Sequence, residues 1–124
     1  DEASERKQLE AVAEVGRDAA LPRVVATYLG LHALPPEAGG DRAGYAARVA
    51  SAWLPGMAKA GLCRFVDAYV DRAAFSVEQA RPVLSRAREL GLGVRVHAGQ
   101  FADVGAADDE FPGAIPDGAG AAVL

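Results

Sequence analysis

The hydrophobic positions along the chain follow two alternating patterns. Stretches with apolar residues three or four apart, the spacing of one helix face, alternate with short and nearly continuous apolar runs, which are typical of strands buried on both faces. Helices and strands are predicted in turn, beginning with a helix, over residues 4–15, 23–29, 41–61, 64–70, 76–91 and 93–98. This alternation predicts an α/β fold in which right-handed crossovers join three parallel strands.

Local signals mark the helix ends. Asp41 is a suitable cap for the second helix, and Gly61 ends it. Residues 76–79, Ser-Val-Glu-Gln, have the form of a capping box for the third. Pro55 is expected to kink the second helix or to start a fresh turn. Pro82 is a local conflict within the third helix, because an interior proline costs about 3 kcal/mol.

The character of the chain changes near residue 105. Residues 105–124 contain four glycines, two prolines and four acidic residues, without a usable hydrophobic period. We therefore expect an α/β unit over residues 1–104, followed by a poorly ordered tail over residues 105–124.

Composition narrows the possible partners. The 124 residues suffice for one domain, and the net charge of -4, without any basic run, argues against nucleic acid as a partner. No apolar run approaches the ~18 residues of a membrane span. The lone Cys63 excludes an internal disulfide framework and indicates a reducing, cytoplasmic setting. The charged N-terminus lacks a signal-peptide core and a starting Met, which suggests processing or a longer parent chain.

Parallel α/β folds place their chemistry at the carboxyl ends of the strands. The polar residues at or just beyond these ends are, strand by strand, His32; Asp67, Tyr69 and Asp71; and His97, Gln100 and Asp103. Both histidines of the chain are in this set, although a single His at a strand end is more often structural, and Asp71 more often caps a turn. Neither a phosphate-binding glycine loop nor a Gly-x-Ser-x-Gly elbow is present.

Residues 27–37, Thr-Tyr-Leu-Gly-Leu-His-Ala-Leu-Pro-Pro-Glu, resemble a stretch of the imidazolonepropionase family in which a Gly-Ala-His-Ala-x-Pro-Pro-Glu segment follows a barrel strand. Further matching pieces follow in the family's order and spacing, from about residue 9 to 104. They are Leu54-Pro55, Gly61-Leu62, Phe65-Val-Asp67, Ala74-Phe-Ser-Val-Glu-Gln79, Leu90-Gly91 and Val96-His-Ala98.

The resemblance implies a (β/α)8 amidohydrolase barrel, of which the three β/α units are a part. It implies hydrolysis of 4-imidazolone-5-propionate to N-formimino-glutamate by water activated on one zinc or iron ion. His97 matches a metal-binding histidine and His32 a substrate-contacting one. Gln100 matches a position, Glu or Gln in the family, that faces the metal-bound water or the substrate. Asp71 stands where the family usually has Glu.

Several departures from the family pattern limit these expectations. Gly99 replaces a frequent acid, and the family's His-x-His pair, a later His and a late metal-binding Asp are absent. A barrel of this kind also needs about 250 residues. We therefore expect a fragment that is inactive alone, whose unpaired strand edges are covered by a homo-oligomer or by the missing barrel portion. The alternatives are a non-catalytic α/β scaffold or binding module, and a flavodoxin-like domain, which needs five strands where three are found.

Overall fold

The computed structural model describes residues 1–101 and 121–123, which form helices packed on a sheet of strand order β1-β2-β3-β4. The elements are α1 (Glu2–Val15), β1 (Thr27–Leu31), the 3-10 turn η1 (Pro36–Ala38), α2 (Arg42–Arg48), the π-helical turn η2 (Val49–Trp53), α3 (Leu54–Lys59), β2 (Phe65–Val70), α4 (Val77–Glu89), β3 (Gly93–Ala98) and β4 (Ala121–Val123). Among the described residues, no helix is both long and apolar enough to cross a membrane.

The predicted parallel order of the first three strands is confirmed. β1 pairs parallel with β2, and β2 pairs parallel with β3 without interruption from Phe65↔Gly93 to Val70↔Ala98. The register between β1 and β2 shifts between Tyr28 and Leu31. Strands that run in the same direction end at the same edge of the sheet, so the residues that follow β1 and β3 are neighbours in space.

One strand prediction needs correction. The first strand begins at Thr27 rather than at residue 23, because its partner β2 begins only at Phe65, opposite Thr27. Val24 and Val25 precede it and are 41% exposed. The short strand β4 pairs antiparallel with β3 and lies within residues 105–124, for which a poorly ordered tail remains a prediction. The rest of that prediction, residues 105–120 and 124, lies outside the described residues.

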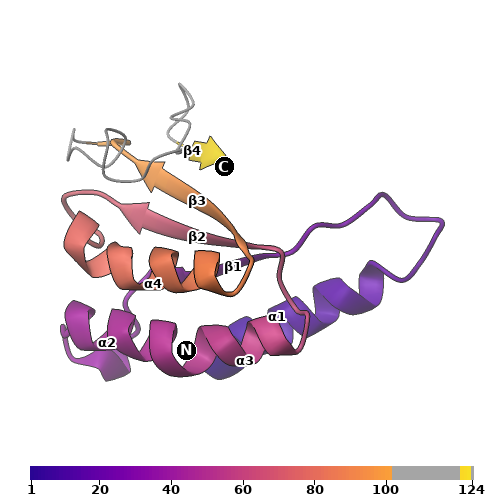
Figure 1. The fold of residues 1–124 in the computed structure, drawn as a ribbon, viewed down its shortest axis with the longest axis horizontal. Helices are drawn as coiled ribbons and strands as arrows, with labels where there is room; N and C mark the ends of the chain where they lie inside the picture. Colours follow the sequence, from indigo (N-terminus) through magenta and orange to yellow (C-terminus); the bar gives the residue numbers. More distant parts are fainter. Residues whose placement is uncertain (102–120, 124) are drawn as a thin grey trace.

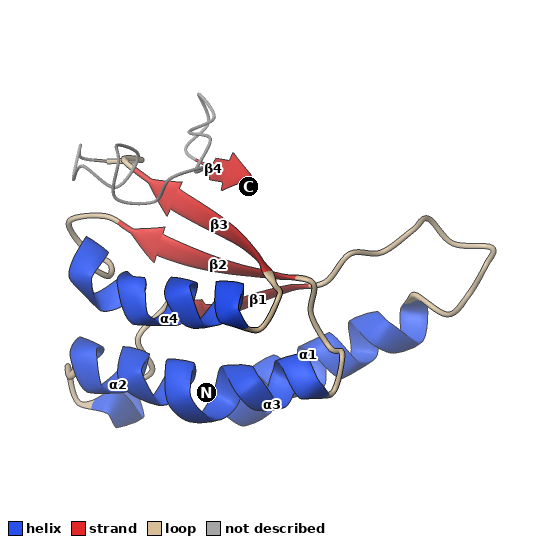
Figure 2. Ribbon diagram, viewed as in Figure 1, coloured by secondary structure: helices blue, strands red, loops and turns tan. Residues whose placement is uncertain are grey.

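The helices cover one face of the sheet. Figures 1 and 2 show α1 to α4 on the same side of β1, β2 and β3. On β2 the side chains of Val66, Ala68 and Val70 point to this side and are fully buried. The alternate residues point to the other face, where Arg95 reaches across β2 to donate to the Thr27 hydroxyl at 2.8 Å, with its guanidinium 3.9 Å from the Phe65 ring centre. The two faces therefore differ sharply in chemistry.

Both proline positions are accommodated. The predicted change near Pro55 appears as the π-helical turn η2, after which α3 begins with Pro55 in its first turn, where its missing N–H is tolerated. Pro82 lies inside α4, which continues to Glu89. The predicted capping box starts α4: Gln79 N–H donates to Ser76 Oγ at 3.3 Å, and Ser76 N–H donates to Gln79 Oε1 at 3.0 Å.

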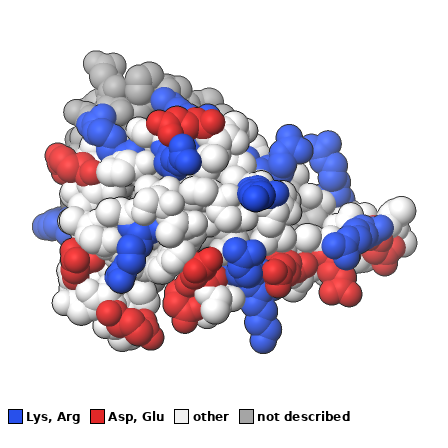
Figure 3. Space-filling view, turned by 60° about the horizontal axis from the view of Figure 1, so that its bottom comes forward, with Lys and Arg blue, Asp and Glu red and all other residues white. Residues whose placement is uncertain are grey.

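Charged side chains on the helices do not segregate by sign. On the face in Figure 3, Lys and Arg alternate with Asp and Glu. Arg6 pairs with Glu2 at 3.5 Å, and Arg86 with Glu89 at 2.8 Å, both on exposed helix turns. This face offers no continuous basic surface of the kind that binds phosphate backbones.

Candidate metal and substrate site

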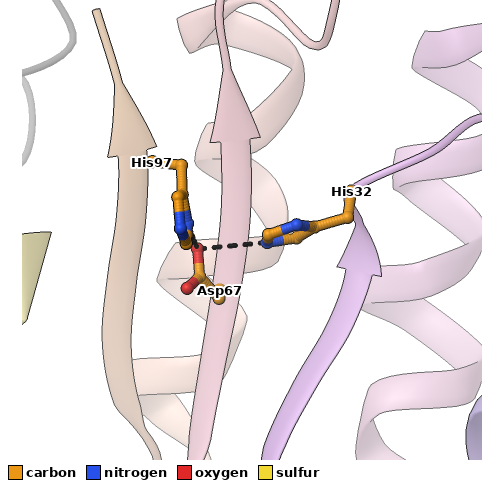
Figure 4. Close-up of side chains that lie close together, drawn as sticks. All are labelled: His32, Asp67 and His97. Atoms are coloured by element: carbon orange, nitrogen blue, oxygen red, sulfur yellow. Dashed lines mark hydrogen bonds and ion pairs between the residues drawn. The ribbon is translucent and has the colours of Figure 1, made fainter. Parts of the chain in front are cut away.

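Three side chains from neighbouring strands meet near the carboxyl edge of the sheet: His32, Asp67 and His97 (Figure 4). His32 is the first residue after β1, where its N–H donates to the Leu29 carbonyl at 3.0 Å. Asp67 lies on β2, and His97 lies on β3 opposite Tyr69, two residues further along β2. The three point to the face of the sheet that carries Arg95 rather than to the helix-covered core.

One carboxylate oxygen lies between the two imidazole rings. Oδ1 of Asp67 is 2.9 Å from Nδ1 of His97 and 3.3 Å from Nε2 of His32. The two rings meet edge to face, with their centres 5.1 Å apart and an interplanar angle of 80°. Asp67 is only 5% exposed, whereas the side chains of His32 and His97 are 29% and 34% exposed. The carboxylate is therefore buried behind two more accessible rings.

The two histidines do not contact Asp67 equally well. The contact with His97 has the geometry of a hydrogen bond. Nε2 of His32 is close enough for a charge interaction, but it is buried without a well-aligned hydrogen-bond partner among the described residues. A misaligned contact contributes little, because a hydrogen bond weakens steeply as its angle departs from linearity. Asp67 thus pairs firmly with His97 and more loosely with His32.

Electrostatics keep Asp67 ionised near neutral pH. Burial alone would raise the pKa of its carboxyl group, because a charge is costly away from water. The hydrogen bond with His97 and the close contact with His32 outweigh this effect, so the pKa of the carboxyl group is lowered from its ordinary value. The site therefore contains a buried negative charge that faces two imidazoles.

These residues fit a divalent transition metal by their donor types. One ligand atom from each of the three lies within 4.8 Å of the others. Imidazole nitrogen with carboxylate oxygen is a donor set that zinc and iron accept. The buried Nε2 of His32, which lacks an aligned partner, is the kind of atom that an ion or a ligand would satisfy.

The loop after β3 carries Gln100, which is exposed. Gly99 has a φ of 66°, a conformation that strains residues with a side chain, so glycine suits this position. Asp71 at the end of β2 anchors the loop, since its Oδ2 accepts from the Phe101 N–H at 2.8 Å. The structure thus brings His32 and His97 together, and it leaves Gln100 on an adjoining loop. Asp103 lies outside the described residues.

The sequence alone does not assign a role to Asp67. Its position near the end of a predicted strand does not link it to either histidine. A signal was available, because Asp67 and Tyr69 are two apart on one strand and share a face, as do Arg95 and His97 on the next. What could not be read was the register that brings Asp67 within reach of His97.

Comparison with known proteins finds clear relatives, although no family profile matches the chain. The chain is 46% identical over 104 residues to an imidazolonepropionase of Aromatoleum aromaticum, which is 84% of this chain and 25% of that protein. It is 44% identical over 107 residues to one of Acidiphilium cryptum, and 42% identical over 107 residues to one of Bradyrhizobium diazoefficiens, each match covering 86% of this chain and 26% of the relative. The resemblance is confirmed, and the chain spans about a quarter of the length of these relatives.

Proposed function

We propose that this chain, related in sequence to imidazolonepropionases, is an internal portion of such an enzyme, a metal-dependent amidohydrolase that opens the ring of 4-imidazolone-5-propionate to give N-formimino-glutamate. One observation carries the proposal. The family resemblance gives roles to two histidines, His32 and His97. Both contact the carboxylate of Asp67, and each is at least 30 residues from Asp67 along the chain. They meet at the carboxyl edge of parallel strands, and α/β enzymes have their active sites at this edge.

The uneven coverage of the sheet supports a closed barrel as the complete fold. A doubly wound sheet has helices on both faces, whereas here α1 to α4 all lie on one side (Figure 2). The other face carries Arg95, Asp67 and His97, as the lumen of a barrel can. In the complete barrel, β1 would pair with a further parallel strand at its free edge, and β3 would do so at the edge that here meets β4. The expected partner of this chain is therefore the rest of the barrel.

The residues of this chain divide the chemistry between them. When bound, a zinc or iron ion supplies a water of lowered pKa and polarises the carbonyl under attack. His97 offers a ligand nitrogen to the ion. His32 contacts the substrate from the neighbouring strand end. Gln100 hydrogen-bonds to the water or the substrate but cannot accept a proton, because an amide does not titrate, so a titratable group other than Gln100 has to serve as the base.

The chain alone should not turn over substrate. A catalytic zinc site usually has three protein ligands and an open position, and in this proposal only His97 of the chain is a ligand. A second candidate function, a non-catalytic metal-binding module, is favoured by the proximity of three ligand atoms in His32, Asp67 and His97. That module would hold one metal per chain without any ring-opening activity.

The test combines metal analysis with a ring-opening assay on the complete protein and on the 124-residue chain. We expect metal and turnover in the complete protein and neither in the chain. His97→Ala should lose both, while His32→Ala should keep the metal and lose turnover. Arg86→Ala, which removes an exposed ion pair on α4, is the matched control and should keep both. A stoichiometric metal in the isolated chain without turnover would support the binding module, and a metal-free, active complete protein would refute the proposal.

A further inference from the structure

We propose that Asp67 is the positioning residue of this site: its carboxylate fixes which ring nitrogen His97 presents outward and holds His32 beside it. The inference deepens the proposed function and rests on it for the role of His97. It assigns a task to a residue for which the family resemblance supplied none.

The hydrogen bond determines the tautomer of His97. An ionised carboxylate only accepts, and a neutral imidazole has one N–H and one lone pair. Because Asp67 Oδ1 lies 2.9 Å from His97 Nδ1, the proton is on Nδ1 and the lone pair is on Nε2. Nε2 is then the only nitrogen of this ring that can bind a cation. Metal-binding histidines commonly donate their other N–H to a carboxylate in this manner, which orients the ring and increases its basicity.

The depth of Asp67 favours support over ligation. Asp67 is 5% exposed, while about a third of each histidine side chain is accessible. A ligand that approached from the open face would meet His32 and His97 before the carboxylate. The Oδ1 atom is also already engaged with His97, and its remaining contact is with His32 at 3.3 Å. In this arrangement Asp67 lies behind the two rings and orders both.

Burying the Asp67 carboxylate costs free energy unless its charge is paired. Asp67 stands between Val66 and Ala68, both fully buried on the helix side of β2. A buried carboxylate is tolerated when it is paired and hydrogen-bonded. Within residues 1–101, the hydrogen-bonding and ion-pair contacts of the Asp67 side chain are with the two histidines. Its charge is therefore committed to ordering these rings.

The first test is a measurement of histidine tautomers in the metal-free 124-residue chain. Long-range proton–nitrogen NMR spectra distinguish Nδ1–H from Nε2–H. We expect His97 to be the Nδ1–H tautomer. Asp67→Asn and Asp67→Ala should both raise its Nε2–H fraction, because the first lets an amide N–H donate to Nδ1 and the second removes the acceptor. His32 should respond in the same experiment with a smaller change.

The matched control is Asp71→Asn, which alters another buried carboxylate at the end of β2 that does not contact a histidine. It should leave the His97 tautomer unchanged. The use of two Asp67 variants keeps the test decisive if one of them fails to fold. A wild-type His97 in the Nε2–H form, or an unchanged His97 spectrum in the folded Asp67 variants, would overturn the inference.

The second test uses the complete protein and metal affinity. Loss of a carboxylate that supports a histidine ligand costs about 10- to 100-fold in metal affinity, so Asp67→Asn should weaken metal binding by this amount, while His97→Ala should abolish it. Abolition by Asp67→Asn as well would identify Asp67 as a ligand and overturn the positioning role. The two proposals can fail separately. The NMR result on the metal-free chain does not depend on turnover, and a protein without ring-opening activity would refute the proposed function alone.

Discussion

The carboxylate of Asp71 accepts a hydrogen bond from the backbone N–H of Phe101 at 2.8 Å, which ties the end of β2 to the loop after β3. Its other oxygen accepts from the N–H of Arg72 at 2.6 Å. The loop so anchored contains Gln100, the residue that the family resemblance places beside the water or the substrate.

We predict that Asp71→Asn loosens this loop. An asparagine has one acceptor oxygen and an NH2 group that would face one of the two backbone N–H donors. Amide hydrogen exchange at Phe101 should become faster in the variant, while exchange within β2 stays slow. Unchanged protection at Phe101 would show that other contacts hold the loop.

The same residue predicts a pH dependence. Hydrogen bonds from the backbone of Phe101, and then of Arg72, lower the pKa of the Asp71 carboxyl group below its ordinary value. Its stabilising contribution is therefore complete above the unfolded-state pKa of about 3.9 and is lost as the pH falls through the lower folded-state value. The stability difference between wild type and Asp71→Asn should be constant near neutral pH and should shrink in strong acid. Urea unfolding at a series of pH values measures this, and a difference that grows toward low pH would contradict it.

A buried tyrosine pair provides a matched test of the core. Tyr45 Oη donates to the Gly30 carbonyl at 2.9 Å, whereas the hydroxyl of Tyr28 is buried without a hydrogen-bond partner among the described residues. Tyr45→Phe should destabilise the fold by about 1–2 kcal/mol, because it leaves a buried carbonyl unsatisfied. Tyr28→Phe should cost nothing or stabilise. Denaturant unfolding of both variants checks the order, and an equal loss in both would be inconsistent with these contacts.

Gly93 is required by close packing rather than by backbone conformation. A Cβ at this position would clash with the ring of Phe65 on the neighbouring strand. Gly93→Ala should therefore cost about 1–3 kcal/mol through overpacking. Gly56→Ala, where the added Cβ meets only the end of the Arg6 side chain at 3.4 Å, is the control and should stabilise α3 by about 0.5–1 kcal/mol. Equal unfolding temperatures of the two variants would contradict the packing role of Gly93.

Much of the fold could be predicted because its signals are local. Capping by Asp41 and Ser76, the interruption before Pro55 and the bounds of β3 all follow from short stretches of sequence. The start of β1 could not be predicted in the same way. Val24 and Val25 have strand-forming side chains, but a strand requires a partner, and β2 begins too late to supply one.

The candidate site shows the same limit. The direction of the strands placed His32 and His97 at one edge, and the structure confirms this. The role of Asp67 depends on the β2–β3 register and on the irregularity in β1 near Leu31, both of which arise from long-range pairing. Periodicity along one strand shows which residues share a face of the sheet, but it does not show which residue of the neighbouring strand lies opposite each of them.

The measurement that tests the central claim most directly is the location of the metal in crystals of the complete protein, by anomalous scattering at the zinc and iron absorption edges. The account predicts one ion about 2.0–2.1 Å from Nε2 of His97, with Asp67 on the opposite side of that ring at Nδ1 and His32 outside the coordination sphere. An ion bound to Asp67 and Nδ1 of His97, or an ion with no contact to His97, would contradict it.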